Sequence, residues 1–174
     1  MPHATTSLAR TGRAFIGTPL ISLALTGLIP GSASSQGIVI QRNLSLGLAR
    51  IVAEATIAEC SSKGFHTAAA VIDRAGQVLV IMRDEQAGPE TAEMARRKAY
   101  TARMFRTTTL EFQKRTLDPA YAPQRNAPDA LALGGGVPIM SGNEILGGVG
   151  SSGSNQEQDD ACAKAGAAKV ADLK

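Results

Sequence analysis

Three glycines near the end of the sequence, Gly148, Gly150 and Gly153, have the spacing Gly-x-Gly-x-x-Gly. Between a strand and a helix, this spacing lets the backbone approach the pyrophosphate of a dinucleotide. A dinucleotide-binding unit also needs a second parallel strand after that helix, ending in an acidic residue. The residues between the predicted last helix and Lys174 supply no such strand, so we do not expect NAD or FAD to bind here.

The same turn retains the chemistry of an anion site. Glycine lets a ligand come close to the backbone, and the free N–H groups at the start of a helix attract negative charge. The segment from Gly150 to Ser154, with Ser151 and Gly153, can therefore hold a carboxylate or a phosphate. The alternative is a tight turn in which a capping box of Ser154 and Glu157 satisfies the donors.

Two cations are candidates for catalysis. Lys98 lies in a predicted helix beside apolar residues, which lower the pKa of an ammonium group and suit it as a base or an electrophile. Arg83 ends a predicted strand and can hold a carboxylate through two N–H groups. Together they predict an enzyme that acts on a small organic carboxylate. In the alternative, both residues only form ion pairs, with Asp84 or Glu93.

Histidine and cysteine are scarce, and this limits other chemistries. Beyond residue 35 the only histidine is His66, which argues against a multi-histidine metal site and leaves one imidazole for any catalytic triad. Cys60 and Cys162 match no zinc-binding spacing, so no metal site is predicted. We predict that the two cysteines form a disulfide; the alternative is two buried thiols on separate helices.

Residues 1–35 have the pattern of a secretory signal, with Arg10 and Arg13 before an apolar stretch that ends in small residues. This stretch is too short and too interrupted for a membrane span, which needs about 20 apolar residues. Residues 1–35 contain two of the 18 basic residues and none of the 15 acidic ones. Residues 36–174 therefore have a net charge of +1, compared with +3 for the whole chain. We expect an exported protein with one domain over residues 36–174; the alternative is a disordered or amphipathic N-terminal tail.

Hydrophobic periodicity and turn residues predict an α+β fold with a mainly antiparallel sheet. Gly76 marks a hairpin between two strands that are apolar on both faces, so we expect helices to cover both sides of the sheet. Pro89 is expected in the first turn of the second helix, whose alanines at positions 92, 95, 99 and 102 allow close packing. The first helix is expected to bury Leu48, Ile51, Val52, Ala55 and Ala58. Helices are predicted at about 44–63, 87–105, 110–115 and 154–170, and strands at about 66–73, 77–83, 134–140 and 144–150.

Three runs of sequence together resemble the GlcG/HbpS family. They are AAAVIDRAGQVLVIMRDEQAGPETAEMARRKAYTARMF, GGGVPIM and GGVGSSGSNQEQDDACAKAG, and the resemblance extends over about residues 44–170. It implies a profilin-like α/β (α+β) fold, an antiparallel sheet of about five strands with helices on both faces. It also implies a homo-oligomer, from dimer to octamer, and a role in binding or degrading heme.

Some residues of this sequence match the family's motifs, and others depart from them. Lys98 stands at the recurring lysine of the family's KAYTA helix, and Gly135 and Gly136 stand in its GGxP turn. Thr107 and Thr108 lie where the family has a threonine near its heme region. The usual GVSGG turn is altered here to GVGSSG at residues 148–153. Axial ligation is not uniform in the family, so the resemblance transfers no iron ligand.

Heme needs an apolar slot, an iron ligand, and cations or N–H groups for its propionates. Arg83 and Lys98 can bind propionates, and Met82 and Met104 can approach the iron, although methionines of this kind more often fill a core. The predicted heme-binding residues are His66, Thr107, Thr108, Gly135, Gly136, Gly150, Ser151, Gly153 and Ser154.

The sequence favours an exported, self-associating protein that binds heme or a related anionic tetrapyrrole, with heme degradation as an extension. The first alternative is the enzyme acting on a small carboxylate. The second is a non-catalytic assembly or sensing module that docks an acidic partner through the seven basic residues between Arg96 and Arg115. Nucleic acid is not expected as a partner, because this segment is short, belongs to a protein expected to be exported, and is poor in interleaved aromatic residues.

Overall fold

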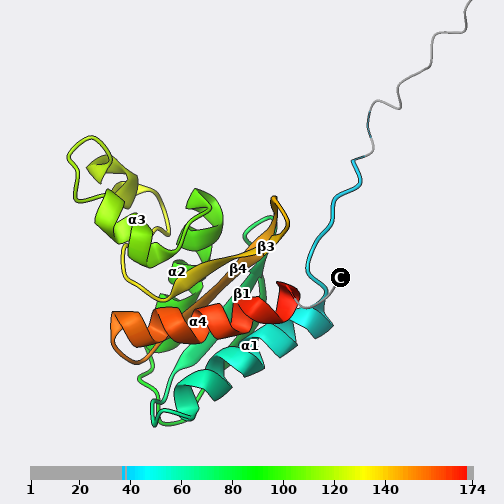
Figure 1. The fold of residues 1–174 in the computed structure, drawn as a ribbon, viewed down its shortest axis with the longest axis vertical. Helices are drawn as coiled ribbons and strands as arrows, with labels where there is room; N and C mark the ends of the chain where they lie inside the picture. The colour runs from blue at the N-terminus through cyan, green and yellow to red at the C-terminus, as the bar shows by residue number, and fades with distance from the viewer. Residues whose placement is uncertain (1–36, 38, 172–174) are drawn as a thin grey trace, which may run out of the picture. The chain divides into compact units, whose positions relative to one another are not determined.

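The computed structural model describes residue 37 and residues 39–171 (Figure 1). The predicted secretory signal over residues 1–35 lies outside the described part. Within that part, no helix has both the length and the apolar character that a membrane crossing requires. In chain order the elements are α1 (Leu46–Ser61), β1 (Ala68–Asp73), β2 (Val78–Arg83), α2 (Thr91–Phe105), α3 (Thr109–Arg115), a 3-10 helix (Ala122–Asn126), β3 (Gly136–Ser141), β4 (Glu144–Ser152) and α4 (Gln156–Ala171).

The sheet has the strand order β2-β1-β4-β3, and every neighbouring pair is antiparallel. The antiparallel α+β prediction is therefore confirmed. The expected number of about five strands is corrected to four among the described residues. The segment between α3 and β3, which contains Pro119, Pro123 and Pro128, forms a 3-10 helix and loops.

Helices cover both faces of the sheet, as predicted: α2 packs on one face and α1 and α4 lie side by side on the other (Figure 1). The two hairpin strands differ, however. All side chains of β1 but the last are buried, whereas Val78 and Ile81 of β2 are 45% and 42% exposed. The expectation that both strands are covered on both sides is wrong for β2, because β2 is an edge strand.

The buried face of α1 differs from the predicted one. Ile51 is 51% exposed, and the buried residues are Ala49, Val52, Ala53, Thr56 and Cys60. The reason is close packing against α4, where a Cβ atom on Gly166 would overlap the Thr56 hydroxyl. Small side chains therefore face α4, and Ile51 is turned outward, whereas Val52 of the predicted face is buried as expected. In α2 the helix begins at Thr91, so Pro89 precedes the first turn instead of lying in it.

Two glycines of the Gly-x-Gly-x-x-Gly motif serve the packing of α2. A Cβ atom on Gly150 would overlap the carbonyl oxygen of Ala95, and one on Gly148 would overlap that of Ala99. On β3, a Cβ atom on Gly136 would overlap the carbonyl oxygen of Lys98. The predicted alanine stripe of α2 faces these glycines, with Ala95, Ala99 and Ala102 fully buried. The helix backbone therefore lies directly on the sheet.

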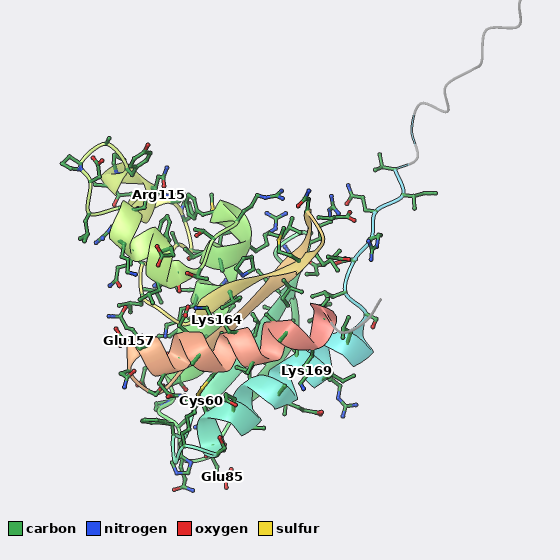
Figure 2. The ribbon with its side chains drawn as sticks, in the orientation of Figure 1. Cys60, Glu85, Arg115, Glu157, Lys164 and Lys169 are labelled. Carbon is green, nitrogen blue, oxygen red and sulfur yellow. A yellow bond between two sulfur atoms is a disulfide. The ribbon has the colours of Figure 1, made fainter. Side chains whose placement is uncertain are left out.

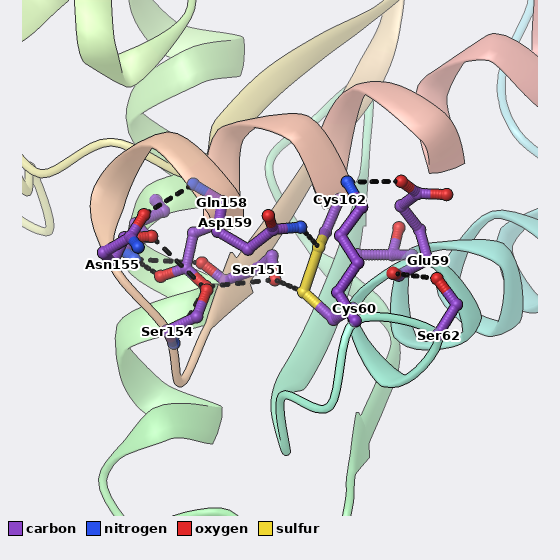
Figure 3. Close-up of a disulfide and its surroundings, with 12 residues drawn as sticks. Glu59, Cys60, Ser62, Ser151, Ser154, Asn155, Gln158, Asp159 and Cys162 are labelled. Carbon is purple, nitrogen blue, oxygen red and sulfur yellow. Dashed lines mark hydrogen bonds and ion pairs between the residues drawn. A yellow bond between two sulfur atoms is a disulfide. The ribbon is translucent and has the colours of Figure 1, made fainter.

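The predicted disulfide is confirmed. Cys60 of α1 and Cys162 of α4 are bonded, with their Cα atoms 5.5 Å apart, and both residues are fully buried. The bridge joins the two outer helices close to the start of α4 (Figure 3).

We predict that Gly150→Ala lowers the free energy of unfolding by about 1–3 kcal/mol or more, because the added methyl group forces α2 away from β4. Denaturant unfolding measures the change. Gly47→Ala is the control: Gly47 lies in the first turn of α1 with no atom closer than 4.0 Å to an added Cβ, so this variant gains up to about 1 kcal/mol in helix propensity. Equal stability of the two variants would contradict the proposed packing role.

Candidate functional site

A surface cleft of about 550 Å³ lies where β4 leads into α4 and where the segment after β2 leads into α2. One wall is the turn of Ser152, Gly153 and Ser154, and the opposite wall comes from the segment before α2. Its lining residues are Gly64, Phe65, His66, Gln86, Ala87, Gly88, Glu90, Thr91, Met94, Ser152, Gly153 and Ser154.

His66 lies in this cleft and is oriented by a carboxylate. Its Nδ1 atom is 3.1 Å from Oδ2 of Asp84, and the imidazole is 44% exposed. Among the described residues, Nε2 of His66 has no hydrogen-bond partner. A backbone N–H from Gln86 and the contact with His66 hold the pKa of Asp84 below its usual range, so this carboxylate is charged at neutral pH. A carboxylate beside Nδ1 favours the tautomer whose proton is on Nδ1, and in that tautomer Nε2 carries the lone pair that a ligand site needs.

The role of Asp84 was missed from the sequence, although the hairpin contains a signal for it. Ala68 pairs with Arg83, and the N–H of Asp84 donates to the carbonyl oxygen of Thr67 at 3.1 Å. Extending the hairpin by one pair places Thr67 opposite Asp84, and His66 is the residue before Thr67. The sequence prediction also missed Phe65, Met94 and Ser152 in the lining of the cleft.

Arg83 lies at the edge of the cleft. Its Nη1 atom donates to the carbonyl oxygen of Asp84 at 3.1 Å and to that of Ala87, a residue of the cleft wall. The alternative of an ion pair with the Asp84 carboxylate is corrected, since that carboxylate binds His66 and Gln86. Nε and Nη2 of Arg83 have no hydrogen-bond partner in the described part of the chain, so the guanidinium retains donors for an anion.

Lys98 is buried outside the cleft in an ion pair. Its Nζ donates to Oδ2 of Asp159 at 2.8 Å and to the carbonyl oxygen of Ser151 at 3.0 Å, and the two charged side chains are 3% and 2% exposed. Burial lowers the pKa of the Lys98 ammonium, and the Asp159 carboxylate opposes that effect. The expected alternative partner, Glu93, instead pairs with Arg96 on the surface. Lys98 and Arg83 therefore share no cavity.

The predicted anion site at the turn is filled by the protein's own carboxylate. Oδ1 of Asp159 accepts hydrogen bonds from the Ser154 hydroxyl at 2.7 Å and the Ser154 N–H at 3.2 Å (Figure 3). The predicted capping box is also wrong, because Oδ1 of Asn155 caps α4 by accepting from the N–H of Gln158 at 2.8 Å. The side chain of Asn155 fits this position because α4 begins at Gln156, one residue later.

The other predicted heme-binding residues do not line the cleft. Thr108 accepts a hydrogen bond from the N–H of Glu111 and so caps α3, with Thr107 beside it. The N–H of Gly136 donates to the Thr109 hydroxyl at 2.8 Å. A Cβ atom on Gly135 would lie 3.1 Å from Nζ of Lys98, so that glycine covers the buried pair. Gly150 and Ser151 lie in β4. Only His66, Gly153 and Ser154 of the predicted set meet at the cleft.

The basic residues between Arg96 and Arg115 are engaged within the protein. Arg96 binds Glu93 and Asp129, and Lys114 binds Glu111. Arg115, labelled on α3 in Figure 2, donates to Gln124 and lies over three aromatic rings. This pattern favours an internally paired surface over a docking face. Within the described residues, no group of three histidine, cysteine or acidic side chains is placed to hold a metal ion.

Comparison with known proteins identifies the family. A family model described as "Haem degrading protein HbpS-like" matches residues 44–168. The chain belongs to the HbpS-like family. Protein GlcG of Escherichia coli K12 is 32% identical over 109 residues, which are 63% of this chain and 81% of GlcG. An uncharacterized 15.0 kDa protein of Citrobacter freundii is 29% identical over 119 residues, 67% of this chain and 84% of that protein.

Solved structures agree with this membership in the HbpS-like family. The crystal structure of a double mutant of Streptomyces reticuli HbpS is 31% identical with a TM-score of 0.74, covering 82% of this chain and 97% of HbpS. The crystal structure of a PduOC–heme complex is 23% identical with a TM-score of 0.66, covering 74% and 96% of the two chains, and shows the same fold. The predicted family and fold are confirmed.

We predict that Lys98→Met lowers the free energy of unfolding by about 3–5 kcal/mol, because it leaves the charge of Asp159 buried without a partner. The double variant Lys98→Met/Asp159→Leu recovers most of this loss, because it replaces both charges with apolar side chains. Urea unfolding of the two variants measures the difference. If the single variant were as stable as the wild type, the ion pair would not be the buried, desolvated contact described above.

Proposed function

We propose that this HbpS-like protein binds heme in the cleft, with Nε2 of His66 as the ligand to the iron. The observation that carries this proposal is the contact between His66 and Asp84 at the cleft. Histidines that bind metals usually donate their second ring N–H to a carboxylate or carbonyl group, which fixes the ring and raises the basicity of the ligating nitrogen. His66 has this arrangement, and a cleft of about 550 Å³ lies beside it.

The other residues of the cleft fit the chemistry of heme. Phe65, Ala87 and Met94 offer apolar surface for a porphyrin face. Arg83, at the edge, has unused N–H donors for a propionate. Heme supplies an iron centre that binds a further ligand or exchanges an electron, while the protein binds, orients and shields it. The heme-complex structure of PduOC, a protein of the same fold, supports the proposal, as does the family's description.

The competing enzyme on a small carboxylate has less support from the geometry. It requires Lys98 and Arg83 around one substrate, yet the Lys98 side chain is 3% exposed and bonded to Asp159. The assembly module is also less favoured, since Arg96, Lys114 and Arg115 form contacts within the protein. Heme binding therefore remains the function that the site supports best.

Titration of the purified protein with hemin, followed by the Soret band, tests this proposal. We expect saturable binding in the wild type and loss of the shifted band in His66→Ala. Asp84→Asn keeps the ligand but removes its charged partner, so it weakens binding by about 10-fold to 100-fold. Arg50→Ala, which breaks an exposed ion pair on α1, is the control and binds like the wild type. Unchanged binding in His66→Ala would refute the assignment of the ligand.

We also infer that the protein is exported. A buried disulfide supports export, because disulfides persist in oxidising compartments and are rare in the cytosol. Protein isolated without reductant from an exported fraction is therefore expected to show no free thiol when denatured, and two after reduction. The bridge spans 102 residues of sequence, and its loss lowers the free energy of unfolding by about 4 kcal/mol. Free thiols before reduction would contradict the disulfide, and absence of the protein from the exported fraction would contradict export.

Self-association and heme degradation stay predictions. The exposed Val78 and Ile81 on the edge strand β2 support self-association, because an unpaired strand edge with apolar side chains favours contact with another chain. Degradation would appear as loss of the Soret band when a reductant and oxygen are added to the heme-bound protein.

A further inference from the structure

The buried ion pair of Lys98 and Asp159 is connected to the cleft through one turn. Oδ2 of Asp159 accepts from Lys98 at 2.8 Å, and Oδ1 accepts from the hydroxyl and the N–H of Ser154. Lys98 also donates to the carbonyl oxygen of Ser151. The pair therefore holds the segment from Ser151 to Ser154 at both of its ends. This segment includes Ser152, Gly153 and Ser154, which form one wall of the cleft.

The same turn also contacts the segment just before β1, which contains His66. Gly153 has a φ of +140°, and a Cβ atom there would overlap the carbonyl oxygen of His66 and lie 2.8 Å from Cα of Thr67. The turn and the backbone of His66 are therefore in direct contact. A shift of the turn changes the width of the cleft and the position of the imidazole together.

We propose that Lys98 is a positioning residue for heme: through Asp159 it holds the Ser152–Ser154 turn in the place where the turn forms the wall of the cleft. This rests on the proposed function. Lys98 does not touch the ligand in this role. Its contribution is geometric, because the Asp159 carboxylate to which it donates is also the acceptor for two donors of Ser154.

The effect of removing both charges distinguishes a positioning role of Lys98 from a purely stabilising role. A buried ion pair often adds little net stability compared with apolar residues of similar volume. The variant Lys98→Met/Asp159→Leu therefore keeps a packed interior but removes the acceptor for the Ser154 N–H and hydroxyl. A stabilising role predicts that this variant binds heme normally, whereas the positioning role predicts a displaced turn in a folded protein.

Two measurements on the same variants test the proposal. The first is amide hydrogen exchange at Ser154 in the protein without heme. We expect the Ser154 amide to lose its protection in Lys98→Met/Asp159→Leu while the amides of β1 stay protected. The second is hemin titration, in which the double variant is expected to bind at least about tenfold more weakly, with an altered Soret band. Ser154→Ala, which removes the hydroxyl bond alone, is expected to fall between the wild type and the double variant.

Phe112→Leu is the control for lost stability, because Phe112 is fully buried in α3 and does not line the cleft. It is expected to unfold more easily and to bind heme like the wild type. Equal weakening in this control and in the double variant would overturn the proposal, as would unchanged heme affinity in the double variant. If the wild type itself bound no heme, the proposed function would fail, and exchange at Ser154 in Lys98→Met, which keeps the Asp159 acceptor, would decide. Retained protection in that variant overturns the positioning of the turn by Lys98, and lost protection at Ser154 with protected β1 amides supports it.

Discussion

The close approach of α2 to β4 is the constraint on which the rest of the molecule depends. Gly148 and Gly150 have no side chain to hold the helix away, so the backbone of α2 lies against the strand. Lys98, on the same helix, is thereby brought beside the end of β4, where it donates to the carbonyl oxygen of Ser151. Gly135 leaves room for its ammonium group, since a Cβ atom there would lie 2.6 Å from the carbonyl oxygen of Ser151 and 2.7 Å from Cβ of Asp159.

This approach connects layers that the sheet otherwise separates. Lys98 belongs to the helix on one face and Asp159 to a helix on the other, and their ion pair joins the two at the end of the sheet. Three residues after Asp159, Cys162 ties α4 to α1 through the disulfide. The sulfur of Cys60 lies 3.7 Å from the hydroxyl of Ser151, and that hydroxyl lies 3.5 Å from Oδ1 of Asp159 (Figure 3). A continuous network of buried contacts, from the disulfide through Ser151 to Asp159, thus supports the turn beside the cleft.

Local patterns in the sequence were sufficient to predict the helices and strands, the hairpin and the family, and from these the antiparallel α+β fold. They misassigned the glycines, because Gly-x-Gly is also the spacing of two residues on one face of a strand. The alanine stripe of α2 was a second signal of close packing. Comparing it with the glycines of β4 could have predicted that the helix lies directly on this strand. The partner of Lys98 had no such signal: Asp159 is 61 residues away, and only the assembled layers bring the two together. Asp84 was within reach of the hairpin register, whereas the capping of α4 by Asn155 depended on a shift of one residue.

The two walls of the cleft are held in different ways, and this difference bears on how a ligand enters. The turn at Ser152–Ser154 depends on bonds from Lys98 and Asp159, buried groups of distant elements. Beyond the contacts of Asp84 with Thr67 and His66, the segment from Asp84 to Thr91 is held by bonds between near neighbours. These are Asp84 to Gln86, Arg83 to Ala87, and the Thr91 hydroxyl to Gly88. Segments with few buried long-range contacts open at lower free energy than the core. The cleft therefore combines a fixed wall, which sets the position of the ligand, with a wall that adjusts to admit it.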